Sequence, residues 1–173
     1  MSLRGNTVDD PRDQHVIDLI ARHGHMVMKV ADAADEPTDL PAYAYSIGAF
    51  ESYGAPELIM FGLDLDTAAI VINDVLADYV AGRRFSLNRP ERDIMGADYP
   101  VVFHEADPDG AKAFAGFADW YYEREPFPMW QLVWPAKNGS FPWEEGCPPE
   151  FSRLQIDLTG GKYWGFEGEL PPV

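Results

Sequence analysis

Three side chains in the N-terminal part of the chain could form a hydrolytic centre: His25, Ser46 and Glu57. A serine hydroxyl becomes a nucleophile when a neighbouring base removes its proton. Glu57 opens an apolar segment directly after Pro56, where a partly desolvated carboxyl group could act as a general acid or base. The G-x-S-x-G motif of serine hydrolases is absent, however, and Glu57 could equally be a polar strand end. The sequence therefore leaves open whether the chain is an enzyme.

The histidines suggest a metal site only weakly. His23 and His25 would share one face of a strand, but Gly24 between them is expected to end a helix, which places His23 at the negative end of that helix. A third ligand such as His104 would have to come from a distant segment. The single cysteine, Cys147, excludes a Cys₄ or Cys₂His₂ zinc site and an internal disulfide. We therefore expect no metal site, and we also expect no cofactor; no strand is followed by a phosphate-binding glycine loop.

An aromatic-rich segment around Asn138-Gly139 is the strongest candidate for binding. Asn-Gly is typical of tight hairpin turns, so residues 129–134 and 141–143 are predicted to pair across it. Pro135 and Pro142 flank the turn and favour a sheet edge, where partners dock. Core packing is the alternative for the same indole rings.

The segment from Tyr43 to Gly48 alternates between large and small residues. Tyr43, Tyr45 and Ile47 would share one face of a strand. The other face would carry only small residues, and a packed helix, another backbone or a ligand must approach it closely. We predict a binding surface in which this strand meets the aromatic hairpin, made of Tyr45, Ser46, Gln131, Trp134 and Trp143.

The remaining elements follow from periodicity and capping signals. Helices are expected from Asp9 or Asp10 to Gly24, from Asp64 or Asp66 to Gly82, and from Asp107 to Arg124. Further strands are expected at Met26–Val30, Glu57–Gly62, Tyr99–His104 and Leu154–Leu158. This order predicts an α+β fold with a mixed or mainly antiparallel sheet of about five to six strands and about three helices packed on it.

Length and charge bound the function further. The 173 residues suit one domain at 9–158, preceded by a disordered or tag-like segment 1–8 and followed by a Gly/Pro/aromatic tail 159–173 that could support homo-oligomers. The 13 basic and 29 acidic residues give a net charge of −16, which disfavours nucleic acid and anionic membranes and favours a basic protein partner or a cationic ligand. No apolar run approaches the ~20 residues of a membrane helix, and we expect a cytoplasmic protein.

Several motifs occur in a recognisable order: Pro41-Ala42-Tyr43-Ala44-Tyr45-Ser46-Ile47-Gly48, Pro56-Glu57-Leu58, Gln131-Leu132-Val133-Trp134-Pro135 and Gly139-Ser140-Phe141-Pro142-Trp143. Together they resemble the bacterial domain-of-unknown-function family 4262, from His15 to Leu158. One departure is Ala136, which follows Pro135 where the family often has an aspartate. The resemblance supports the α+β fold and transfers no activity. We therefore predict a non-catalytic binding or interaction domain of the immunity type, with a hydrolase as the alternative.

Overall fold

Six strands form one mixed sheet in the order β1-β2-β3-β6-β5-β4. The computed structural model describes residues 1–31, 40–96, 99–162 and 164. The strands are β1 (Met26–Val30), β2 (Tyr43–Ile47), β3 (Glu57–Phe61), β4 (Pro90–Glu91), β5 (Val101–Glu105) and β6 (Met129–Val133). Neighbours are antiparallel except β3 and β6, which run parallel. The α+β fold with a mixed sheet is confirmed.

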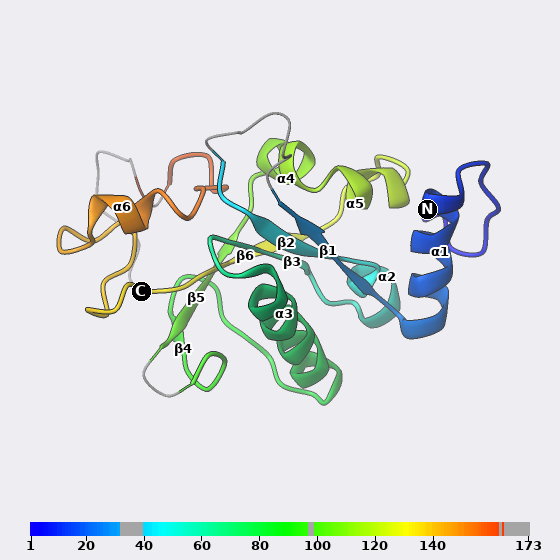
Figure 1. The fold of residues 1–173 in the computed structure, drawn as a ribbon. Helices are drawn as coiled ribbons and strands as arrows, with labels where there is room; N and C mark the ends of the chain where they lie inside the picture. The colour runs from blue at the N-terminus through cyan, green and yellow to red at the C-terminus, as the bar shows by residue number, and fades with distance from the viewer. Residues whose placement is uncertain (32–39, 97–98, 163, 165–173) are drawn as a thin grey trace.

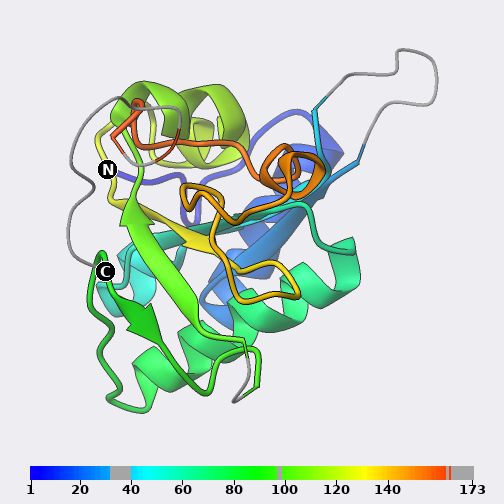
Figure 2. The same ribbon diagram turned by 90° about the vertical axis from the view of Figure 1, so that its left-hand side faces the viewer.

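Six helices lie within the described residues: α1 (Pro11–His23), α2 (Ala49–Tyr53), α3 (Leu65–Val80), α4 (Pro108–Phe114), α5 (Gly116–Tyr121) and α6 (Pro149–Ser152). In Figures 1 and 2, α3 covers one face of the sheet, and α4 and α5 lie over the opposite face. The core accordingly has two main layers. Tyr45, Ile59 and Phe61 pack with α1, α4 and α5, whereas Leu58 and Met60 pack with α3.

Local signals place the two longest helices where the sequence predicts them. Asp10 caps α1 by accepting a hydrogen bond from the Arg12 amide at 2.8 Å, and Gly24 ends the helix with φ 89°. Asp64 caps α3 through the Thr67 amide at 3.0 Å. The small face of β2 is approached by a helix, as its residue sizes indicate, because Ala44 belongs to the core layer formed with α3.

The helix expected from Asp107 to Arg124 is instead two helices. Ala115 ends α4 and precedes α5 with φ −113° and ψ 52°, which is not a helical conformation. Ala115 is fully buried, so the break sits inside the protein rather than at its surface. Together with the short helices α2 and α6, this division accounts for a helix number above the predicted three.

The aromatic hairpin is a second correction. Residues 141–143 form no strand, although the Ala136 amide does donate to the Ser140 carbonyl at 2.8 Å around the Asn138-Gly139 turn. The reason is topological: β6 lies between β3 and β5, so both of its edges are already paired. The expected strand Leu154–Leu158 is also absent: residues 154–158 form a turn, a bend and irregular backbone.

The N-terminal segment 1–8 lies against the helices. The Leu3 amide donates to the Tyr121 carbonyl at 2.9 Å, and Arg4 donates to the Ile20 carbonyl at 3.1 Å. These two bonds join the segment to α5 and α1. Most of the tail 159–173 and of the acidic loop after β1 lies outside the described residues. Within those residues no helix is long and apolar enough to cross a membrane.

Candidate functional site

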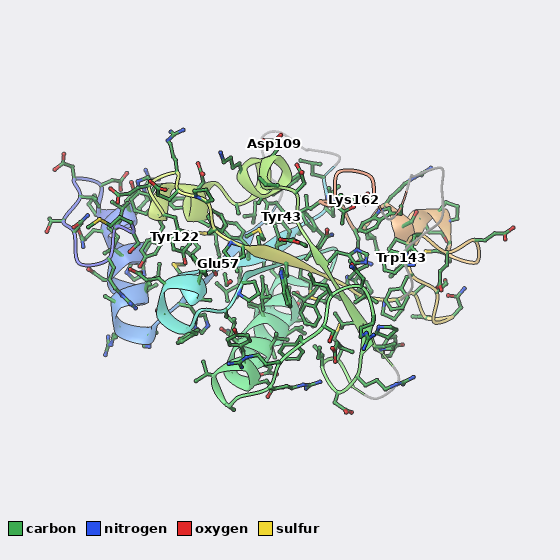
Figure 3. The ribbon with its side chains drawn as sticks, turned by 180° about the vertical axis from the view of Figure 1, so that it is seen from behind. Tyr43, Glu57, Asp109, Tyr122, Trp143 and Lys162 are labelled. Atoms are coloured by element: carbon green, nitrogen blue, oxygen red, sulfur yellow. The ribbon has the colours of Figure 1, made fainter. Side chains whose placement is uncertain are left out.

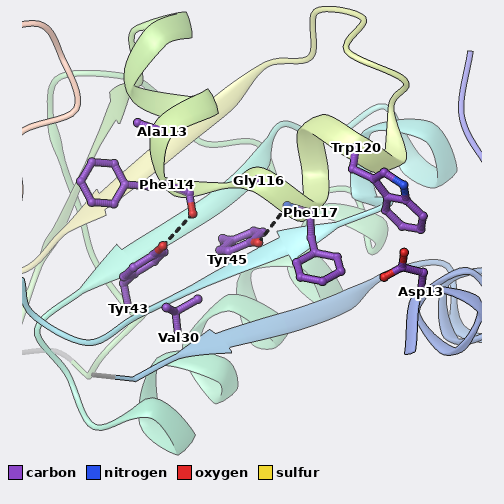
Figure 4. A pocket seen from close by; sticks show the side chains of 9 residues that line it. All are labelled: Asp13, Val30, Tyr43, Tyr45, Ala113, Phe114, Gly116, Phe117 and Trp120. Atoms are coloured by element: carbon purple, nitrogen blue, oxygen red, sulfur yellow. Dashed lines mark hydrogen bonds between the residues drawn. The ribbon is translucent and has the colours of Figure 1, made fainter. Parts of the chain in front are cut away.

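A groove of about 490 Å³ lies on the face of the sheet that carries α4 and α5 (Figure 4). Strands β1 and β2 form its floor, the junction of α4 and α5 forms its wall, and α1 contributes Asp13. Both its size and its mainly apolar lining are typical of small-ligand sites. Five of its nine described lining residues are aromatic: Tyr43, Tyr45, Phe114, Phe117 and Trp120.

Two tyrosines of β2 hold the wall in place. The Tyr43 hydroxyl donates to the Phe114 carbonyl at the end of α4 (2.9 Å), and the Phe117 amide at the start of α5 donates to the Tyr45 hydroxyl (3.3 Å). Helix ends leave such carbonyl and amide groups without partners inside the helix. Because strand side chains alternate, both tyrosines point to the same face. The two tyrosines therefore both line the groove and fix the position of its helical wall.

The groove offers shape and aromatic area rather than a reactive group. Burial raises the pKa of Tyr45 to about 12 and also raises the pKa of Tyr43, so both phenols are neutral at physiological pH. Tyr45 is 2% exposed, and its hydroxyl accepts a hydrogen bond from the Phe117 amide. The described lining residues include no serine, cysteine, histidine or lysine.

A buried carboxyl group lies elsewhere on the same face of the sheet. Glu57 is fully buried at the start of β3. One of its oxygens accepts from the amides of Gly48 (2.8 Å) and Phe50 (3.2 Å) and from the Tyr122 hydroxyl, and the other is hydrogen-bonded to the Ser46 hydroxyl. Desolvation raises the Glu57 pKa against the opposing effect of these donors. Glu57 thus fixes the first turn of α2 to the sheet.

The three catalytic candidates do not form one centre. Ser46 and Glu57 are in contact, but both are fully buried, and Ser46 also accepts from the Leu58 amide at 2.9 Å. His25 belongs to another network: its Nδ1 lies 3.0 Å from the Tyr53 hydroxyl and its Nε2 lies 2.8 Å from Asn73 Oδ1. This arrangement supports a structural role for the Ser46–Glu57 pair.

The histidines considered as metal ligands are also dispersed. His23 is exposed at the end of α1, whereas His104 is buried on β5 beside Trp143, with 4.8 Å between the ring centroids. Desolvation lowers the pKa of His104 to about 3, so its imidazole is neutral. Among the described residues, no group of three His, Cys, Asp or Glu side chains could hold a metal ion.

The residues of the predicted binding surface are divided among separate environments. Tyr45 lines the groove, whereas Ser46 faces Glu57. Trp134 donates through its indole N–H to the Phe61 carbonyl at 2.8 Å, and Trp143 stacks on Phe141 with 5.0 Å between ring centroids. In Figure 3, Glu57 and Trp143 lie toward opposite ends of the sheet.

Gln131 has a structural role. Its side chain donates to the Ile156 carbonyl and accepts from the Leu158 amide at 3.1 Å. Gln155 makes the equivalent pair of bonds to Trp134, the residue after β6. Its side-chain oxygen accepts from the Trp134 amide at 3.1 Å, and its side-chain nitrogen donates to the Trp134 carbonyl at 2.8 Å. These two glutamines hold residues 155–158 along β6 without a further strand.

Trp134 borders a second cavity, of about 610 Å³, on the opposite side of β6 from Gln131. Its apolar lining residues include Leu63, Met95, Pro135 and Phe151. The sequence singles out Trp134 but not this cavity, because Phe151 comes from α6, which periodicity does not predict. The sequence does not predict the groove either. Phe117 and Trp120 have no distinguishing signal within the expected helix, and they line the groove with β2 because of the break between α4 and α5.

Comparison with known proteins identifies the family of the chain. A family model described as "Domain of unknown function (DUF4262)" matches residues 19–148. The chain belongs to the DUF4262 family. The DUF4262 match includes all six strands, α4 and α5, and hence most of the groove, whereas Asp13 precedes it. No curated protein and no solved structure matches the chain significantly.

Proposed function

We propose that this DUF4262 domain acts by binding and not by catalysis, and that its ligand occupies the groove between β1–β2 and α4–α5. The observation that carries this proposal is that five aromatic side chains line a groove with a volume of about 490 Å³. Aromatic side chains contribute large contact areas at little conformational cost, which suits recognition. The proposed ligand is a small molecule or a side chain with an apolar body.

Solvent exposure of the rings supports the same function. Phe117 is 38% exposed, and Trp120 and Phe114 are partly exposed, so apolar surface remains available at the groove. Burying apolar surface yields about 25 cal/mol per Å². The hydrogen bonds from Tyr43 and Tyr45 to the α4–α5 junction hold the walls before a ligand arrives, which lowers the cost of binding.

A fragment screen tests the proposal. Small aromatic and aliphatic compounds would be screened by ligand-observed NMR against the wild type, Phe117→Ala, Trp120→Ala and Phe50→Ala. Phe50 is a matched control because it is 39% exposed on α2, outside the described lining of the groove. We expect bound fragments to lose at least about tenfold in affinity in the two groove variants and to bind Phe50→Ala normally. Fragments that bind all four proteins equally would overturn the proposal.

The net charge of −16 supports a basic ligand or partner protein, as in immunity-type proteins that neutralise a cationic partner in the cytoplasm. If a basic protein is the partner, its capture by the immobilised domain should weaken as salt rises, and a groove-binding fragment should displace it. Capture of a partner that neither rising salt nor the fragment reduces would contradict this part of the proposal.

The Ser46–Glu57 contact is the observation that favours the hydrolytic alternative. Because both side chains are fully buried, a substrate could reach them only if α2 moved away from the sheet. Chromogenic ester substrates would be tested on the wild type and Ser46→Ala. Turnover that disappears in Ser46→Ala would replace the binding proposal by an enzymatic one.

A further inference from the structure

Asp13 places a carboxylate at the end of the aromatic groove. It lies in the first turn of α1, is partly buried, and lines the same cavity as Phe117 and Trp120. Figure 4 shows its carboxylate directed toward these two rings. Within the described part of the chain, no hydrogen bond or ion pair engages this carboxylate. The neighbouring Arg12 is paired with Asp10 at 3.2 Å and also interacts electrostatically with Asp13.

The electrostatics of this arrangement favour a cation. The faces of aromatic rings carry negative partial charge and attract cations within about 6 Å of the ring centre. Asp13 adds a full negative charge at the same place, and the net charge of −16 raises the local concentration of cations and lowers that of anions. An anionic ligand would oppose all three effects.

The apolar lining selects among cations. A plain ammonium group is strongly hydrated and loses that hydration in an aromatic groove. An alkylated ammonium presents methyl groups that pack against the rings while its charge faces Asp13.

We infer that the groove selects small organic cations with an alkylated ammonium head group, with Asp13 as the residue that sets this preference. The inference rests on the proposed function, since it specifies the ligand of the same groove. It adds a charge requirement that a purely apolar site would not have.

The test compares choline with 3,3-dimethyl-1-butanol, its neutral isostere, in which carbon replaces the charged nitrogen. Binding of each would be measured by NMR titration of the Trp120 indole signal in the wild type, Asp13→Asn and Asp18→Asn. Asp18 is the control because it is exposed on the same helix and outside the described lining of the groove. We expect choline to bind the wild type about two- to thirtyfold more tightly than the isostere. Asp13→Asn should reduce this ratio to the part that the aromatic rings contribute, and Asp18→Asn should leave it unchanged.

Equal binding of the two compounds to the wild type, or no binding of choline, would overturn the inference. So would a preference for choline that is as large in Asp13→Asn as in the wild type. These failures are distinct from failure of the proposed function, because neutral fragments that bind the wild type and lose affinity in Phe117→Ala would still support the groove as a ligand site. Correct folding of each variant would be checked by its thermal unfolding midpoint.

Discussion

The Tyr43 hydroxyl and the Phe114 carbonyl oxygen lie 2.9 Å apart and join the first residue of β2 to the last residue of α4. This hydrogen bond satisfies a carbonyl that the break at Ala115 leaves at a helix end. It also sets one wall of the aromatic groove, since both residues line it. Stability of the fold and shape of the site therefore depend on the same contact.

Tyr43→Phe should lower the free energy of unfolding by about 0.5–1.5 kcal/mol, because it removes this hydrogen bond and retains the ring. Urea denaturation measures the change. Tyr99→Phe is the control: Tyr99 is 39% exposed, and its substitution should stay within about 0.5 kcal/mol of the wild type. Equal effects of the two substitutions would show that the bond to Phe114 contributes nothing.

We predict that Glu57 makes the free energy of unfolding decrease as pH rises. Its pKa is raised in the folded protein, so the folded state retains the carboxyl proton at pH values where the unfolded chain has lost it. The stability due to this proton is complete below the ordinary pKa of 4.5 and is lost as pH rises through the folded-state pKa. The slope is at most about 1.4 kcal/mol per pH unit for one proton.

Glu57→Gln isolates this effect, because an amide nitrogen that cannot titrate replaces the oxygen facing Ser46. The free energy of unfolding of the wild type minus that of Glu57→Gln should therefore decrease from pH 4.5 upward. Urea titrations at several pH values measure this difference. Glu125→Gln, at an exposed position, is the control for replacing a carboxyl group that is not buried. A constant difference for Glu57→Gln would contradict the raised pKa.

We predict that His104 makes the free energy of unfolding depend on pH in the opposite direction. Its folded-state pKa is lowered from 6.5 to about 3, so the unfolded chain binds the proton first as pH falls. The stability associated with neutral His104 is present above pH 6.5 and is lost progressively toward pH 3. The histidine ring signal of His104 should stay unchanged between pH 8 and about 5 in NMR spectra. Relative to His104→Phe, the wild type should lose stability over this acid range; His15→Asn, at an exposed site, serves as control.

Gly48 and Gly116 predict opposite effects of the same substitution. Gly48 has φ 97°, and an added Cβ would lie 2.5 Å from Ile20 Cγ2, so Gly48→Ala should cost about 1–3 kcal/mol. Gly116 opens α5 with no heavy atom within 4 Å of such a Cβ, so Gly116→Ala should stabilise by about 0.4–1 kcal/mol. Thermal unfolding distinguishes the two. A lower midpoint for Gly116→Ala would show that the α4–α5 break requires glycine.

Local chemistry in the sequence determined much of the fold. The Asp10 cap and Gly24 define α1, and the alternation in β2 places Tyr43 and Tyr45 on one face, because caps and strand periodicity depend only on neighbouring residues. The order of motifs also indicated the family, which the match over residues 19–148 confirms.

Tertiary structure decided the site, because strand order and helix packing depend on contacts between distant segments. The insertion of β6 between β3 and β5 left no free edge for the hairpin that Asn138-Gly139 predicts, and Trp134 and Trp143 pack in different hydrophobic clusters. Hydrogen bonds from β2 stabilise the break at Ala115 and bring Phe117 over the sheet. Ser46 and Glu57 are adjacent in space only because β2 and β3 pair, and no local pattern could place them beneath α2 rather than in an open cleft.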